Sequence, residues 1–122
     1  MGLSTHVLDT MHGCPAAGMQ VVLSTWEGAS SQSLPARELL RFELNEDGRP
    51  PAGLLMAHDA LQPGRYRLSF DVAAYFRRKQ VALPPIEFLD WVHLDFGLAF
   101  ADQHYHVPLL VSPWSYSTYR GS

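Results

Sequence analysis

Residues 104–122 read HYHVPLLVSPWSYSTYRGS, and this stretch predicts a β-hairpin. In its first half His104 and His106 are two residues apart, and alternate side chains of a strand share a face, so both imidazoles should point the same way. Serine and proline at residues 112–113 then provide a turn. Residues 115–120 alternate hydroxyl and aromatic side chains without an apolar stripe of helical period, which favours a returning antiparallel strand.

Upstream of the hairpin the chain repeats the alternation that is typical of half-buried strands. Residues 3–9 place Val7 on one face and His6 on the other, so a core-facing Val7 leaves His6 toward solvent or another subunit. Residues 73–79 offer the one convincing short helix. Further strands are expected at residues 18–26, 37–44, 53–56, 65–72 and 86–96, the last with Phe88, Val92, Leu94 and Phe96 on one face. A serine-rich loop is expected at residues 27–35.

About eight short strands, turns at regular spacing, one short helix and no βαβ alternation predict an all-β fold, an antiparallel β-sandwich. A chain of 122 residues is long enough for one hydrophobic core and too short for two. We therefore expect residues 1–122 to form a single domain.

Composition and charge indicate which partners and which cellular location to expect for this protein. Nine basic and twelve acidic residues give a formal net charge of −3 with no long run of either sign, so we expect no nucleic-acid partner. No signal peptide or membrane-spanning run is visible, which predicts no membrane contact and a cytoplasmic location. Cys14 is the single cysteine and can form no intrachain disulfide; it lies in a Gly-Cys-Pro turn, which favours a structural rather than a nucleophilic role.

Three blocks of this sequence resemble the 5-hydroxyisourate hydrolases of the transthyretin-like family. They are LSTHVLDT at residues 3–10, NEDGR at residues 45–49, and HYHVPLL joined to the terminal YSTYRGS. The blocks occur in the family's order and together extend over the whole chain. The sequence departs from the family pattern at residues 83–86, where the family tends to have aromatics before a single proline, and at residues 34–44.

The resemblance implies a fold of two four-stranded sheets whose last strands pair edge to edge into a dimer, with two dimers stacked into a homotetramer around a central channel. It implies hydrolysis of 5-hydroxyisourate to 2-oxo-4-hydroxy-4-carboxy-5-ureidoimidazoline in urate degradation, with no cofactor. Low charge, at 17% of residues, leaves room for such a buried interface.

The resemblance also places a pocket in the channel and assigns its residues. His6, Arg49, His106 and Ser122 are the expected catalytic residues, and His6, Arg49 and Tyr119 are expected to bind substrate. These side chains suit the reaction, because histidine titrates near neutral pH and a guanidinium binds the oxygens of a flat anionic ring. Without the resemblance, Arg49 reads as an ordinary solvated arginine. Sequence does not decide whether His6 or His106 is the base.

The histidines allow two other interpretations. His104, His106 and a third histidine such as His6 could form a three-ligand zinc site, but no Asp, Glu or Cys stands at ligand spacing beside them, so we expect no metal. A hormone carrier like vertebrate transthyretin would share the fold without catalysis. Such a carrier lacks the histidines and the terminal Tyr-Arg-Gly-Ser, and this sequence keeps both.

Overall fold

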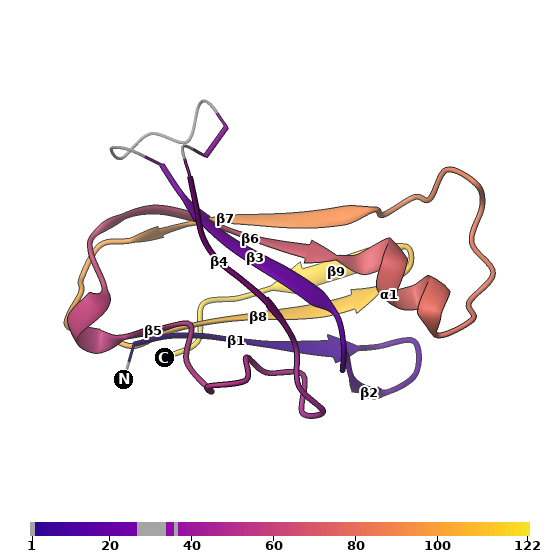
Figure 1. The fold of residues 1–122 in the computed structure, drawn as a ribbon, viewed down its shortest axis with the longest axis horizontal. Helices are drawn as coiled ribbons and strands as arrows, with labels where there is room; N and C mark the ends of the chain where they lie inside the picture. The colour runs from indigo at the N-terminus through magenta and orange to yellow at the C-terminus, as the bar shows by residue number, and fades with distance from the viewer. Residues whose placement is uncertain (1, 27–33, 36) are drawn as a thin grey trace.

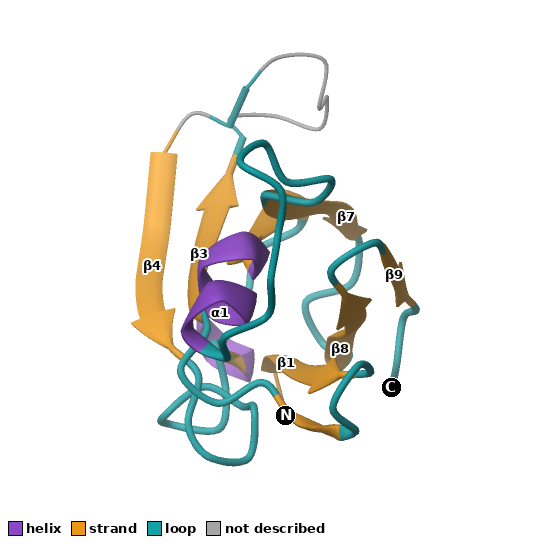
Figure 2. Cartoon of the chain, turned by 90° about the vertical axis from the view of Figure 1, so that its right-hand side faces the viewer, coloured by secondary structure: helices purple, strands orange, loops and turns teal. Residues whose placement is uncertain are grey.

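A computed structural model describes residues 2–26, 34–35 and 37–122 of the chain. The loop expected at residues 27–35 lies largely outside the described residues. Two sheets face each other across a common core, with the helix at one end and both chain termini at the other (Figure 1). Seen from the helix end, β3 and β4 lie on one side of the molecule and β1, β8 and β9 on the other (Figure 2).

The strands and helices follow the expected pattern closely. One sheet has the order β2-β1-β8-β9, with β5 also paired to β1, and the other has the order β4-β3-β6-β7. This confirms the all-β sandwich with one short helix. The elements are β1 (Gly2–Asp9), β2 (Cys14–Pro15), β3 (Gln20–Thr25), β4 (Arg37–Glu43), β5 (Met56–Ala57), η1 (His58–Ala60), β6 (Gly64–Asp71), α1 (Val72–Arg78), β7 (Trp91–Leu98), β8 (Tyr105–Ser112) and β9 (Ser115–Thr118).

The core lies between the two sheets and is made by the inward faces predicted from the alternation. The side chains of β1 and β8 meet those of β3 and β6, because alternate side chains of each strand point toward the opposite sheet. These contacts provide most of the hydrophobic stabilisation of the fold. Fully buried residues on the facing strands are Leu3, Val7, Val21, Leu23, Leu68, Phe70, Leu109 and Val111.

One strand pairing differs from the antiparallel expectation. β1 and β8 run parallel, in register from Leu3 opposite Tyr105 to Asp9 opposite Val111. Residue alternation has the same period in either direction, so it predicts which side chains share a face but not the direction of the neighbouring strand. The parallel pairing decides which residues of β1 lie beside the histidines of β8.

Three local expectations were wrong. β7 begins at Trp91 rather than at residue 86, and Phe88 is 72% exposed. The Asp90 carbonyl accepts from the amides of Val72 and Ala73, so this segment closes the first turn of α1 instead of joining a strand. The short strand expected at residues 53–56 is Met56–Ala57, because Gly53 closes a turn.

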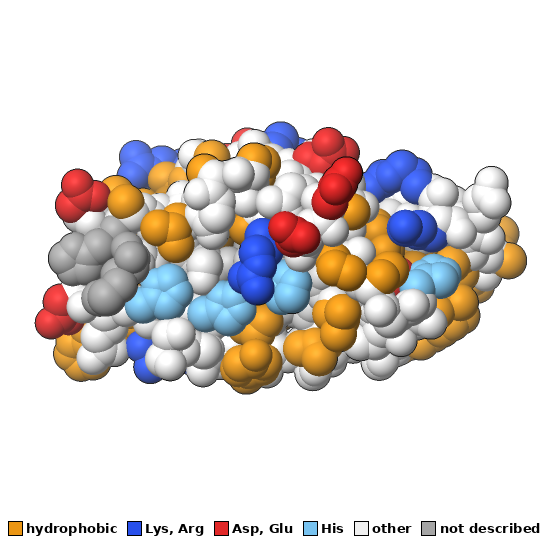
Figure 3. Space-filling model, turned by 90° about the horizontal axis from the view of Figure 1, so that it is seen from below, with side chains coloured by type: hydrophobic (Ala, Val, Ile, Leu, Met, Phe, Trp, Pro, Cys, Tyr) orange, Lys and Arg blue, Asp and Glu red, His pale blue; other side chains and the backbone are white. Residues whose placement is uncertain are grey.

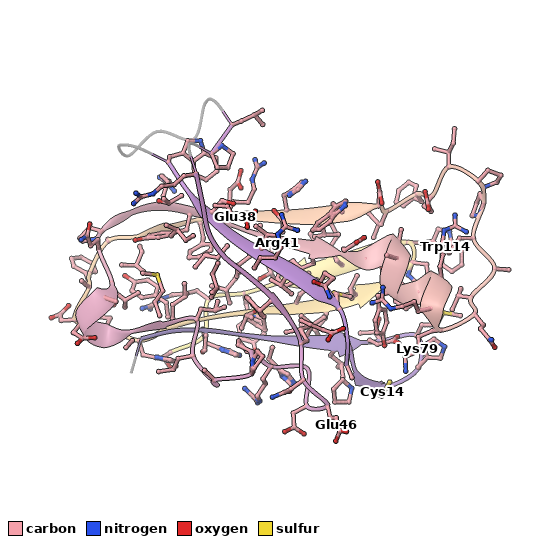
Figure 4. All side chains as sticks on the ribbon, viewed as in Figure 1. Cys14, Glu38, Arg41, Glu46, Lys79 and Trp114 are labelled. Atoms are coloured by element: carbon pink, nitrogen blue, oxygen red, sulfur yellow. The ribbon has the colours of Figure 1, made fainter. Side chains whose placement is uncertain are left out.

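The third correction concerns Cys14, which lies in the two-residue strand β2 rather than in a turn. It is paired with Asp9 of β1. Figure 4 shows Cys14 at the β2 end of the sheet.

Within the described residues, no helix is both long and apolar enough to cross a bilayer.

Candidate active site

The site is built on the outer face of β1 and β8. Because alternate residues of β1 fill the core, Ser4, His6 and Leu8 face outward. The parallel register then places Ser4 beside His106 and His6 beside Pro108. Figure 3, which views the molecule from the β1 side, shows several histidine side chains gathered on this face with a basic side chain against two of them.

Three of the expected site residues line one small pocket. His6 comes from β1, His106 from β8, and Tyr119 from the tail that follows β9, so segments from both ends of the chain converge here. The pocket has a volume of about 180 Å³. Its full lining is His6, Leu8, His106, Pro108, Leu109, Leu110 and Tyr119.

Arg49 is brought to this face by a tight turn. The Asn45 side-chain oxygen accepts from the amides of Asp47 and Arg49 at 2.9 and 3.1 Å, while Glu46 points outward at the tip (Figure 4). The Val7 amide donates to the Gly48 carbonyl at 3.0 Å, which attaches the turn to β1 beside His6. Gly48 has φ +72°, and a Cβ there would lie 2.6 Å from the Val7 carbonyl oxygen. Only glycine therefore allows this approach.

The electrostatics of the site act on His106. Burial lowers the pKa of His106 below its ordinary value, and the positive charge of Arg49 lowers it further, followed by His6 and His104. His106 is thus held neutral at a pH where a free histidine is still partly protonated. Arg49 does not line the pocket itself, but its charge reaches the His106 ring.

Ser4 and Gly2, which no sequence motif singles out, contact the histidines directly. The Ser4 Oγ lies 2.8 Å from His106 Nδ1 and 3.2 Å from His104 Nε2. The Gly2 amide donates to His104 Nδ1 at 2.9 Å. Period-two spacing of Ser4 and His6, and of His104 and His106, was a signal for shared faces, but only the parallel register brings the two pairs together.

The C-terminal tail folds back onto β8. Gly121 and His106 exchange backbone hydrogen bonds of 2.7 and 3.2 Å. The Arg120 guanidinium turns away from the pocket: it lies 4.4 Å over the Tyr105 ring and donates to the Gln103 side chain at 3.0 Å. Arg120 therefore anchors the tail.

Ser122 is less well placed than expected. It follows Gly121 and is exposed, and within the described part of the chain its hydroxyl has no hydrogen-bond partner. His6, His106 and Tyr119 therefore line one pocket, and the charge of Arg49 acts on His106. The Ser122 side chain makes none of these contacts.

The remaining described histidine side chains lie elsewhere. His12 contacts Asp9 at 2.6 Å, and His93 contacts Ser69 Oγ at 2.7 Å on the other sheet. Among the described residues, no group of three or more His, Cys, Asp or Glu side chains is arranged to hold a metal ion.

Comparison with known proteins places this geometry in a family. Residues 3–121 match the model described as HIUase/Transthyretin family. A 5-hydroxyisourate hydrolase from Pseudomonas aeruginosa is 51% identical over 121 residues, which cover 98% of this chain and 90% of the relative.

Two solved structures have similar folds. The 5-hydroxyisourate hydrolase of Klebsiella pneumoniae has a TM-score of 0.76 and 33% identity, with both chains fully covered. A crystal structure of (S)-allantoin synthase has a TM-score of 0.88 and 42% identity, covering 99% of this chain but 43% of that one. By its sequence and by its structure, the chain belongs to the HIUase/Transthyretin family.

Proposed function

We propose that this chain is a hydrolase of 5-hydroxyisourate, which it converts to 2-oxo-4-hydroxy-4-carboxy-5-ureidoimidazoline in urate degradation. The observation that carries the proposal is the convergence of two imidazoles, His6 and His106, on one pocket within reach of the Arg49 charge. The relatives of this chain that carry the name 5-hydroxyisourate hydrolase support the same activity.

The reaction explains why the pocket needs these groups. Water adds to a ring carbonyl, the C–N bond to that carbon breaks, and the products are the carboxyl and ureido groups. A base must take a proton from the water, and the departing nitrogen must receive one, so a single histidine can carry the proton between them. A cation or N–H donor must stabilise the charge that develops on the attacked oxygen.

The remaining residues fit supporting roles. Arg49 offers a planar, permanently charged group for the oxygens of the flat substrate ring. Tyr119 lines the pocket and offers a ring face and a hydroxyl for the edge of the substrate. The Ser122 hydroxyl would orient the water or an imidazole once the tail is enclosed by a second subunit.

We propose further that the active form is a homotetramer. The pocket of one chain, about 180 Å³, is smaller than ordinary ligand pockets of about 300 Å³ or more, so a partner would have to complete it. Tyr119 is 60% exposed, and Trp114 and Tyr116 of the hairpin are also exposed, which suits burial in an interface. Activity should then fall on dilution together with the tetramer measured by sedimentation.

We place the protein in the cytoplasm as one domain covering residues 1–122, without metal or cofactor. Its single cysteine, which can form no intrachain disulfide, suits a reducing compartment. The similarity to (S)-allantoin synthase covers less than half of that chain, so its named activity is not proposed for this one.

The decisive experiment follows the transient absorbance of freshly generated 5-hydroxyisourate. Addition of the protein should speed its decay greatly, and His6→Ala/His106→Ala should remove the effect. A carrier of the transthyretin kind would bind without changing the decay. An unchanged decay rate with the correctly assembled protein would therefore reject the proposed activity.

A further inference from the structure

A chain of hydrogen bonds leads from the start of β1 to the pocket. It runs from the Gly2 amide to His104 Nδ1, from His104 Nε2 to Ser4 Oγ, and from Ser4 Oγ to His106 Nδ1, over 2.9, 3.2 and 2.8 Å. Ser4 is 6% exposed and lies 102 residues from His106 in sequence. The parallel pairing of β1 with β8 creates these contacts.

The first link fixes the state of His104. A backbone N–H can only donate, so His104 Nδ1 must accept through its lone pair. A protonated imidazole has no such acceptor, and a neutral one carries its hydrogen on the other nitrogen. In the form of His104 that makes this hydrogen bond, the ring proton is on Nε2, from which His104 donates to Ser4 Oγ.

The hydrogen bond between Ser4 and His106 then determines which nitrogen of His106 carries the proton. The Ser4 hydroxyl has one proton, and its Oγ already accepts from His104. Within the described residues, His106 Nδ1 is the remaining partner of that hydroxyl, so Ser4 donates to it at 2.8 Å. An unsatisfied buried hydroxyl proton would cost roughly 1–3 kcal/mol, which disfavours the reverse arrangement.

We propose that Ser4 and His104 are positioning residues that hold His106 as a neutral ring with its proton on Nε2, so that His106 is the hydrogen-bond donor of the pocket and His6 is the group that carries the proton. Gly121 supports the same ring from the other side, because its backbone pairs with that of His106. The inference rests on the proposed hydrolase activity and decides between its two candidate bases.

The chemistry is consistent with this division of roles. A neutral imidazole is a poor source of a proton but a good N–H donor to an oxygen that gains negative charge. His106 would therefore stabilise the attacked carbonyl oxygen together with Arg49. His6 takes the proton of the attacking water and returns it to the ring nitrogen as the C–N bond breaks, which leaves both histidines in their starting states.

The test combines a spectrum with kinetics on the full chain. Long-range ¹⁵N–¹H spectra of histidine-labelled protein, recorded well above the ordinary histidine pKa of about 6.5, separate the two neutral forms of each ring. His106 is assigned from the spectrum of His106→Gln. We expect His106 with its proton on Nε2 in the unaltered protein, and a mixture of both forms in Ser4→Ala.

The kinetic arm asks whether the positioning matters for turnover of 5-hydroxyisourate. Ser4→Ala should lower kcat at least about ten-fold with little change in KM, because the donor is misplaced. Ser69→Ala is the matched control: it removes a serine-histidine contact of the same kind at 2.7 Å, on a serine that is 7% exposed, in the other sheet. It should leave kcat unchanged.

A second pair of variants covers the case in which Ser4→Ala does not fold. His104→Gln can still accept from Gly2 and donate toward Ser4, whereas His104→Phe can do neither, so the glutamine variant should keep more activity. A His106 proton on Nδ1 in the unaltered protein would overturn the inference, as would full activity in His104→Phe. If the spectrum is as expected but 5-hydroxyisourate is not hydrolysed, the proposed function fails and the assignment of the ring stands.

Discussion

The Gly121 amide donates to the His106 carbonyl at 2.7 Å, and a Cβ at Gly121 would lie 3.0 Å from His106 Cβ and 3.1 Å from Cδ2. The tail is thus in direct contact with the ring that lines the pocket. Gly121→Ala should move either the ring or the tail. We expect kcat to fall about ten-fold or more and the melting temperature to change little. A large loss of melting temperature with normal turnover would contradict this.

His6→Ala and His106→Ala should each lower kcat by roughly 10²–10⁴-fold, the usual contribution of a positioned acid or base. Both side chains face away from the sandwich core, so the fold should survive. Circular dichroism and thermal melting provide the check on structure. Turnover close to normal in both variants would remove this pocket as the active site.

The charge of Arg49 can be tested through the pKa of His106. Because that charge lowers the pKa of His106, Arg49→Gln should let it rise toward the ordinary value of about 6.5. Arg49→Lys should keep most of the pKa effect but lose turnover, since an ammonium cannot bind two oxygens in a plane. Proton NMR titration of His106 in the two variants measures the first effect, and steady-state kinetics the second.

Tyr75 should contribute to stability and not to catalysis. Its hydroxyl donates to Asp9 Oδ2 at 2.8 Å, and both residues are buried. Burial alone would raise the pKa of Asp9, but hydrogen bonds from the His12 backbone, the His12 ring and Tyr75 outweigh it and lower that pKa. Tyr75→Phe should therefore cost about 1–3 kcal/mol in urea unfolding. Turnover per folded molecule should be unchanged.

Stability should fall as the pH drops below about 6.5. Burial lowers the pKa of both His106 and His93 in the folded protein, so the unfolded chain takes up these protons first. The free energy of unfolding begins to fall near pH 6.5, the pKa of about 6.5 in the unfolded chain, and continues to fall until the pH is below the lower pKa values of the folded protein. Above about pH 6.5 these two histidines do not lower the stability. Urea unfolding across this range should show a shallower decline in His106→Gln and in His93→Gln. If the free energy of unfolding declines equally in both variants and in the unaltered protein, His106 and His93 are not the groups that cause the loss of stability.

The sequence by itself determined the class of fold, and its resemblance to a known family supplied the candidate pocket residues. Period-two alternation predicted that His6 leaves the core and that His104 and His106 share a face, because successive side chains of a strand alternate between its two faces. At residues 45–49 the structure forms a tight turn in which Gly48 has a positive φ and the Asn45 side chain accepts from the Asp47 amide, as the Asn, Asp and Gly residues of this stretch favour.

Only the tertiary structure decided which outward side chains touch. Alternation has the same period in parallel and antiparallel strands, so the sequence could not place Ser4 beside His106 or the Gly2 amide on His104. Nor could it show that the Asp90 carbonyl closes the start of α1, which removes residues 86–90 from β7. These contacts join segments far apart along the chain, and their partners are set by the register and packing of whole sheets, because the local sequence carries no information about the neighbouring strand.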